Sequence, residues 1–181
     1  MKQSELITAA LKGDATLVVK NARVVNVFTN EILEGDVALS EDTIIGVGKG
    51  FAAREEIDAG GAYLCPGFID AHVHIESSMV IPDSFSRVIM PHGTTTIIAD
   101  PHEIANVCGV AGVRAIYKLS DDLPLRVLFM MPSCVPATPF ENSGATLTAE
   151  DMEQFMRKSR ILGLGEVMDA VSTINLSLIH I

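Results

Sequence analysis

From residue 65 onward, the sequence alternates between short apolar runs and stretches with a helical pattern. Strands are expected over residues 68–74, 95–99, 126–131 and 161–166. Helices are expected over residues 82–90 and 103–119, and again from Thr148, where Thr148 and Asp151 resemble a capping box. Near-continuous apolar strands separated by helices are typical of parallel β-sheets. About four such units amount to half of a closed (β/α)8 barrel of the TIM type.

The residues before this alternation have a different sequence pattern. Residues 16–64 consist of short β-branched segments and polar turns, which predicts a small antiparallel sheet that packs on something else. Residues 1–15 carry charges around a short apolar run, so we expect an amphipathic helix there and not a secretory signal.

The composition excludes some classes of partner. The 181 residues include 13 basic and 23 acidic side chains, giving a net charge of −10. Such a chain repels phosphate backbones, so we expect no binding of nucleic acid. No apolar run has the length of a membrane span, so we expect no membrane association. The odd cysteine count of three predicts free buried thiols, a reducing compartment and hence the cytoplasm.

The segment 66–74, PGFIDAHVH, predicts a buried strand that ends in a metal-binding pair. Alternate residues of a strand share a face, so His72 and His74 are expected to point in the same direction. Two imidazole nitrogens placed in this way could converge on one divalent ion at about 2.0–2.2 Å. The alternative is a pair of histidines on a half-exposed strand without a metal. The preceding Pro-Gly, Asp70 and the polar segment 76–78 favour the metal site.

Ionisable side chains gather at the expected ends of three of the four strands. The first strand ends with His72 and His74, the second with Asp100 and His102, and the fourth with Glu166. Chemistry in α/β barrels gathers where the strands end and the following loops begin. Core packing does not explain such a set, so the sequence predicts a site that contains a metal.

Glu166 is the third predicted metal ligand. It follows Gly163 and Gly165, which leave room beside the backbone, and its carboxylate could bridge two cations. The alternative is an acid at a helix N-terminus that only favours the helix dipole. We favour the bridging ligand.

Asp100 and His102 allow several interpretations. They could bind a metal, hold the substrate or orient a ligand from behind it, and we favour contact with substrate or ligand over direct coordination. Glu76, two residues beyond His74, is a further candidate for that substrate-binding or orienting role.

The same residues carry a resemblance to a known family. Segment 66–74 resembles the first-strand signature of the amidohydrolase superfamily. Segments 75–79 (IESSM), 93–96 (GTTT), 99–107 (ADPHEIANV) and 163–168 (GLGEVM) are similar to the bacterial adenine deaminase family within it. The Glu-Ser-Ser and Asp-Pro-His-Glu elements are not general to cyclic amidohydrolases such as dihydroorotase or allantoinase. The resemblance runs from about residue 5 to residue 174.

This resemblance implies a fold and an activity. Residues 16–64 would be an incomplete segment of a composite β-sandwich, and residues 65–174 the first half of a distorted barrel. A binuclear Fe(II) or Mn(II) centre would bind His72 and His74 to its more buried ion, with Glu166 as the bridging ligand. Ligand type alone suits Zn about as well. The reaction would be hydrolysis of adenine, a small-molecule purine, to hypoxanthine and ammonia, carried out by a full-length protein that we expect to be a homo-oligomer.

The chain also departs from the family. Barrels of this kind need about 250 residues, so we expect a fragment that is inactive alone. The general base and the remaining metal ligands are expected in the missing half, which leaves the catalytic residues unknown. Residues 175–181 do not resemble the family, so we interpret them as a tail of non-native origin and give His180 no role.

Two other functions stay open. One is another cyclic amidohydrolase, although the Asp-Pro-His-Glu segment argues against it. The other is a non-catalytic metal-binding module, for which three ligand-bearing strand ends are more than the function needs.

Overall fold

The computed structural model describes residues 4–5, 8–9, 12 and 15–176, and the chain divides into two compact units, Met1–Pro66 and Gly67–Ile181. Residues 4–5 and 8–9 are helical, whereas residue 12 lies in a turn and β1 begins at Ala15; the other residues of the helix expected over 1–15 lie outside the described residues. His180 and most of the tail also lie outside them.

The first unit is a mixed sheet, not the antiparallel sheet predicted. Its strands are β1 (Ala15–Asn26), β2 (Glu31–Ser40), β3 (Thr43–Gly48), β4 (Ala53–Asp58) and β5 (Tyr63–Leu64). Hairpins pair β1 with β2 and β2 with β3, but β4 and β5 both pair parallel to β1. The outer edge of β2 is occupied by β3, so β4 pairs with the remaining edge of β1. The chain crosses the sheet between β3 and β4, and β4 then runs in the same direction as β1. A small core contains Val18, Ala38 and Phe51.

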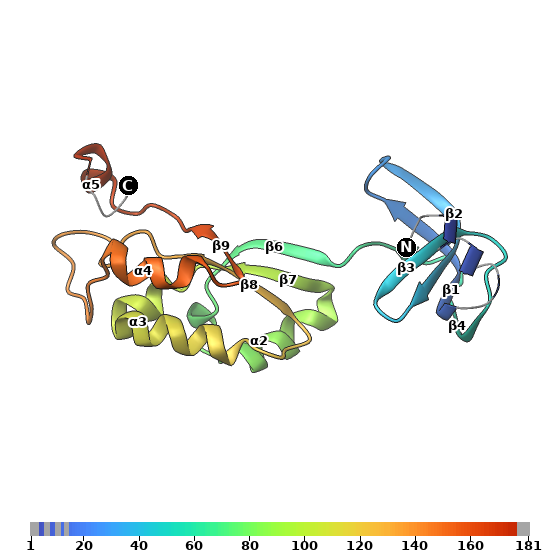
Figure 1. The fold of residues 1–181 in the computed structure, drawn as a ribbon, viewed down its shortest axis with the longest axis horizontal. Coiled ribbons are helices and arrows are strands. Elements are labelled where there is room, and N and C mark those ends of the chain that lie inside the picture. The colour runs from blue at the N-terminus through green and yellow to red at the C-terminus, as the bar shows by residue number, and fades with distance from the viewer. Residues whose placement is uncertain (1–3, 6–7, 10–11, 13–14, 177–181) are drawn as a thin grey trace. The chain divides into compact units, whose positions relative to one another are not determined.

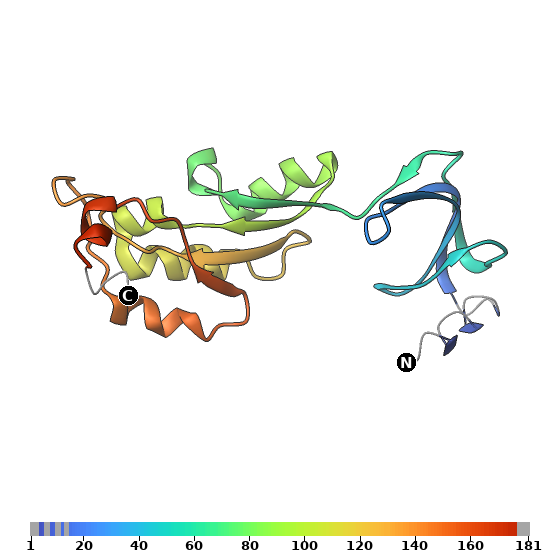
Figure 2. The same ribbon diagram turned by 90° about the horizontal axis from the view of Figure 1, so that it is seen from above.

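The second unit is built from parallel strands with helices between them, as predicted (Figures 1 and 2). Its strands are β6 (Phe68–Val73), β7 (Thr94–Ala99), β8 (Arg126–Met131) and β9 (Ile161–Leu164), in the order β6-β7-β8-β9. The connecting helices are α2 (Pro82–Ile89), α3 (His102–Leu119) and α4 (Ala149–Met156), with short helices η1 (Glu76–Ser78), η2 (Met90–His92) and α5 (Ala170–Ile174). All neighbouring strands are parallel, so their carboxyl ends lie at one edge of the sheet.

The core of this unit lies between the sheet and its helices. Ile97, Val127 and Phe129 from the strands are almost fully buried, and they belong to one cluster with Val113 of α3 and Phe155 of α4. The capping box predicted at Thr148 is present: Asp151 N donates to Thr148 Oγ1, and the Asp151 carboxylate accepts from Thr148 N. The helices therefore anchor the strands whose ends carry the polar residues.

The cysteines are free, as expected, but only Cys134 is buried; Cys65 and Cys108 are exposed. Among the described residues, no helix is both long enough and apolar enough to cross a bilayer.

Candidate metal centre

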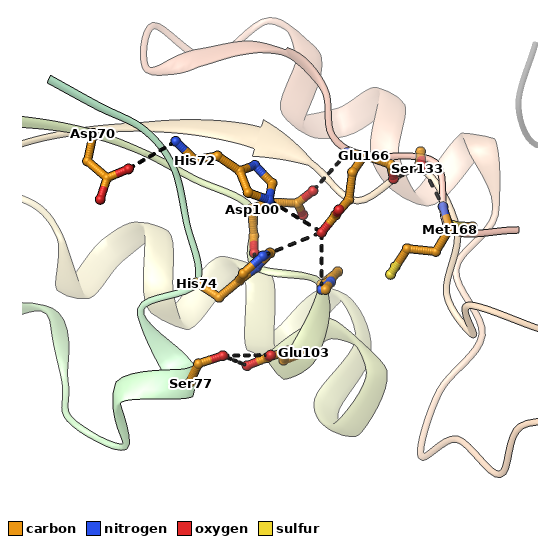
Figure 3. Close-up of polar contacts among 11 residues, drawn as sticks. Asp70, His72, His74, Ser77, Asp100, Glu103, Ser133, Glu166 and Met168 are labelled. Carbon is orange, nitrogen blue, oxygen red and sulfur yellow. Dashed lines mark hydrogen bonds and ion pairs between the residues drawn. The ribbon is translucent and has the colours of Figure 1, made fainter.

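Three side chains meet at the carboxyl edge of this sheet: His72 near the end of β6, His74 directly after β6, and Glu166 after β9. His72 Nε2 and His74 Nε2 each lie 3.4 Å from Glu166 Oε1 (Figure 3). The two imidazole rings are 4.8 Å apart and nearly perpendicular. The structure thus brings together the three residues predicted as ligands, and their donor atoms all lie within 4.8 Å of one another.

An irregularity in β6 orients the first histidine. The register of β6 against β7 shifts between Asp70 and Val73. The Asp70 carboxylate accepts a hydrogen bond from His72 N at 3.2 Å, next to this shift. Irregularities of this kind redirect a side chain near a functional site, and here they accompany the convergence of His72 and His74.

A backbone contact fixes the form of the His74 ring. His74 Nδ1 lies 2.8 Å from the carbonyl oxygen of Asp100. A carbonyl oxygen only accepts, so Nδ1 carries the proton and donates it. The neutral ring then has its lone pair on Nε2, the atom that faces Glu166. An imidazole bound in this way is ready to coordinate a metal.

Glu166 is held through its backbone on both sides. Its N–H donates to Asp100 Oδ2 at 3.1 Å, and its carbonyl accepts from Ser133 Oγ at 2.6 Å. The preceding Gly165 packs directly on the Asp100 carboxylate. These contacts leave the Glu166 side chain free to point toward the histidines.

Asp100 therefore supports the centre without belonging to the three-residue cluster. Its side chain is 1% exposed, and Oδ1 has no hydrogen-bond partner among the described residues. Burial raises the pKa of this carboxyl above its ordinary value, although His102, the N–H of Glu166 and His74 favour the charged form. The orienting role expected of Asp100 from the sequence stays a prediction.

His102 lies closer to the cluster than the sequence indicated. It is the first residue of α3, and its Nε2 is 3.7 Å from the same Glu166 oxygen that faces His72 and His74. Its ring centroid is 4.5 Å from that of His74.

Glu76 contacts the backbone of α3 and not the three-residue cluster. Its Oε1 accepts from Ile104 N in the first turn of α3, 3.1 Å away, and its Oε2 is buried without a partner in the described structure. Beside it, Ser77 Oγ contacts both carboxylate oxygens of Glu103 at 2.6 and 2.7 Å. These contacts connect η1, just after His74, to the start of α3, where His102 lies. The structure thus gives Glu76 a supporting contact.

The contacts of Ser133 and Cys134 were not predicted from the sequence. Ser133 anchors the Glu166 carbonyl, and Cys134 Sγ accepts from Met168 N at 3.3 Å. Both residues follow β8, so their place at a strand end was the only available signal. Their partners lie in the segment after β9, and no local pattern predicts such contacts.

The donor set and its spacing fit a divalent cation. Two ligands that bind one ion at about 2.1 Å with tetrahedral angles are themselves roughly 3.4 Å apart. The distances from Glu166 Oε1 to His72 Nε2 and His74 Nε2 have this value. Neutral imidazole and carboxylate are donors that Fe, Mn and Zn accept.

The burial of Asp100 leads to a prediction about pH. In the metal-free protein its raised pKa means that the folded state binds a proton more readily than the unfolded state. This contribution to the free energy of unfolding is present at low pH and is lost as the pH rises through the folded-state pKa. Asp100→Asn removes this dependence, so its stability relative to the wild type is expected to increase as the pH rises above 3.8, the ordinary pKa of an aspartate, and passes through the higher folded-state pKa. Urea unfolding in the presence of chelator measures it, and a constant difference between the two proteins would contradict the prediction.

Comparison with protein families places the chain by its sequence. The Amidohydrolase family matches residues 63–173, which include β6 to β9 and the three-residue cluster. The chain belongs to this family.

Within this family, the chain is most usefully compared with individual curated proteins. The chain is 53% identical over 169 residues to an adenine deaminase of Halalkalibacterium halodurans, covering 92% of this chain and 29% of that protein. It is 55% identical over 156 residues to an adenine deaminase of Clostridium acetobutylicum, covering 86% of this chain and 27% of that protein. The chain therefore spans less than a third of the length of these curated relatives.

Solved structures agree on the fold. A D-hydantoinase from a Thermus species superposes with a TM-score of 0.55 at 20% identity, covering 77% of this chain and 31% of that one. An atrazine chlorohydrolase from Arthrobacter aurescens, complexed with zinc, gives 0.58 at 13% identity, covering 82% and 46%. These TM-scores show that the fold, a partial α/β barrel, is shared. At sequence identities this low, they do not indicate a shared substrate.

Proposed function

We propose that the complete protein containing this chain is an adenine deaminase, which hydrolyses adenine to hypoxanthine and ammonia. The observation that carries this proposal is the identity of 53% to an adenine deaminase over 92% of the chain. The convergence of His72, His74 and Glu166 at the end of the sheet supports it, because hydrolysis of an aromatic amine needs an activated water.

In this proposal His72 and His74 would hold one divalent ion, and Glu166 would be the carboxylate ligand shared with a second. The ions are Fe(II) or Mn(II), with Zn(II) acceptable to the same donors; zinc is present in a related fold, the atrazine chlorohydrolase. When bound, such ions supply Lewis acidity, which makes hydroxide available from water at neutral pH.

The residues of this chain prepare that chemistry. The Asp100 carbonyl keeps the His74 proton on Nδ1, so that Nε2 faces the centre. Asp100 and Ser133 fix the backbone of Glu166. The general base that transfers protons to the leaving amine is assigned to the part of the protein beyond this chain.

We also propose a metabolic role, a compartment and an oligomeric state for the complete protein. We assign it to purine salvage and adenine catabolism in the cytoplasm, as a homo-oligomer without nucleic-acid or membrane partners. The net charge of −10 and the free cysteines support these assignments.

An assay of the complete protein encoded at the source locus tests the activity. Loaded with Fe(II) or Mn(II), it is expected to convert adenine to hypoxanthine with release of one ammonia, detected by chromatography and an ammonia assay. A hydantoin and an N-acyl amino acid serve as comparison substrates. Hydrolysis of either without turnover of adenine would replace this proposal by another amidohydrolase activity.

A further inference from the structure

The segment around His74 lies along the start of α3 and is bonded to it at several points. The Val73 carbonyl accepts from Asp100 N at 3.0 Å, and His74 Nδ1 donates to the Asp100 carbonyl at 2.8 Å. Further along both segments, Glu76 Oε1 accepts from Ile104 N at 3.1 Å. These contacts continue where the pairing of β6 with β7 ends. They connect the end of β6 and η1 to the turn that leads into α3.

Glu76 supplies a cap that α3 lacks locally. Pro101 occupies the N-cap position of α3 and makes no side-chain cap. The first N–H groups of a helix have no acceptor within the helix, so they need one from elsewhere. Ile104 is the third residue of α3, and its N–H finds an acceptor in Glu76, 28 positions earlier in the chain. A carboxylate is also favourable at this end of a helix because of the helix dipole.

Ser77 adds a second contact to the same turn of α3. Its Oγ lies 2.6 and 2.7 Å from the two carboxylate oxygens of Glu103 (Figure 3). The short helix η1 that carries Ser77 is itself anchored. Ile75, just before it, is fully buried in the core, and Met79 N closes it by donating to the Glu76 carbonyl at 2.9 Å. Glu76 and Ser77 therefore act on α3 from a fixed base.

We infer that Glu76 and Ser77 are positioning residues of the metal centre: by fixing the first turn of α3, they hold the Asp100 carbonyl in front of His74 Nδ1. That carbonyl keeps the proton of the ring on Nδ1, so that Nε2 faces the centre. The inference rests on the metal centre of the proposed function and deepens it. For Glu76 it selects orientation over substrate binding, the two roles that the sequence left open.

Direct contact of Glu76 with substrate is the competing explanation, and the burial of its carboxylate argues against it. Oε1 is occupied by Ile104 N, while Oε2 has no measurable contact with solvent and no partner among the described residues. A substrate must reach a group from solvent, so neither oxygen is available to a purine. The N-terminal end of α3, which favours a negative charge, explains why a carboxylate is buried here.

Titration of the chelator-treated complete protein with Co²⁺ tests the inference. Glu76→Ala removes the acceptor for Ile104 N, and it is expected to weaken Co²⁺ binding about tenfold, since the partners of metal ligands contribute roughly 10–100-fold. The visible absorption of bound Co²⁺, which reports coordination geometry, should change as well. The matched control is Glu153→Ala, the same substitution at an exposed acid of α4, and it should change neither affinity nor spectrum.

A conservative variant separates the hydrogen bond from a general loss of packing. Glu76→Gln keeps a side-chain oxygen that can accept from Ile104 N. It is therefore expected to restore the wild-type spectrum and most of the Co²⁺ affinity. A folded Glu76→Gln protein with the affinity and spectrum of Glu76→Ala would contradict the inference, because the contact with Ile104 would not be what positions the centre.

The contact between Ser77 and Glu103 gives a second test on exposed side chains, whose replacement leaves the core intact. Ser77→Ala and Glu103→Ala should each weaken Co²⁺ binding. The double variant should bind no more weakly than the more affected single variant, because both substitutions remove the same contact. Unchanged affinity in the single variants, or losses that add in the double variant, would overturn the role assigned to Ser77.

The outcomes separate the inference from the proposed function. If folded Glu76→Ala is less stable in urea but keeps wild-type Co²⁺ affinity and spectrum, the contact serves stability alone and the inference is wrong. If Glu76→Ala raises only the KM for adenine, Glu76 contacts substrate, so the inference is wrong while the deaminase proposal stands. If it changes the Co²⁺ spectrum of a protein that does not turn over adenine, the proposed function falls and the inference stands. If the wild type binds no Co²⁺, the inference falls together with the metal centre.

Discussion

Glu166→Gln is expected to weaken divalent-metal binding by more than about 100-fold and to lower adenine turnover by roughly 10³-fold or more. Glu166 Oε1 lies within 3.4–3.7 Å of three imidazole nitrogens. An amide is a far weaker donor than a carboxylate, and it cannot offset the charge of two cations. The substitution keeps the shape of the side chain, so its effect reports charge and donor strength.

Metal content after dialysis and the rate of hypoxanthine formation measure this effect. Glu153→Gln on α4 is the matched control, because it removes the same charge from an exposed acid of the same unit. It should retain wild-type metal content and turnover. A Glu166→Gln protein with its full complement of metal would exclude Glu166 as a ligand and favour the interpretation as a simple helix-end acid.

The second unit was largely predictable because its signals are local. The predicted strand over 126–131 and the capping box at Thr148 are confirmed, and the boundaries of the other strands differ by no more than two residues. Each of these predictions depends on residues within a few positions of one another. The spacing of His72 and His74 is equally local and predicted that they face one site, although β6 ends at Val73 and its register shifts between Asp70 and Val73.

The mixed sheet of the first unit was not predictable in the same way. The sequence of β4, AREEID, is rich in acidic residues that are depleted in strands. Nothing in β4 or β5 indicates which edge of the sheet they join. Hairpins bias the expectation toward antiparallel pairing because their turns are visible in the sequence. The parallel pairs result from a crossing connection, which has no local signature.

In the candidate site, too, the features with local signals were predictable and the contacts between distant residues were not. Glu166 was predicted from its place after a strand, but the approach of His102 to it depends on how β7 and β9 are placed in the sheet. The contact between Asp100 and the Glu166 backbone likewise joins residues 66 positions apart. The sequence indicated room beside Gly165, but it did not indicate that the Asp100 carboxylate fills that room.

Gly165→Ala is therefore expected to damage both the stability and the metal centre. A Cβ at this position would lie 1.9 Å from Asp100 Oδ2 and 2.6 Å from its Cγ, far inside contact distance. Asp100 is buried and bonded to Glu166 N, so it cannot turn away cheaply. Overpacking of this kind costs about 1–3 kcal/mol, and any shift of the backbone moves the adjacent Glu166 away from the histidines. We expect metal affinity to fall by at least about tenfold.

Gly163→Ala is the matched control two residues earlier. Its Cβ would meet only Met130 Cε at 3.6 Å, an ordinary contact, so its stability should stay within about 1 kcal/mol of the wild type. Urea unfolding and Co²⁺ titration of both variants compare them. Adding Asp100→Ala to Gly165→Ala should recover part of the lost stability, because it removes the atoms that clash and the two sites are coupled. Equal stability and affinity in the two single variants would mean that Asp100 yields freely, and that the backbone of Glu166 does not depend on its contact with Asp100.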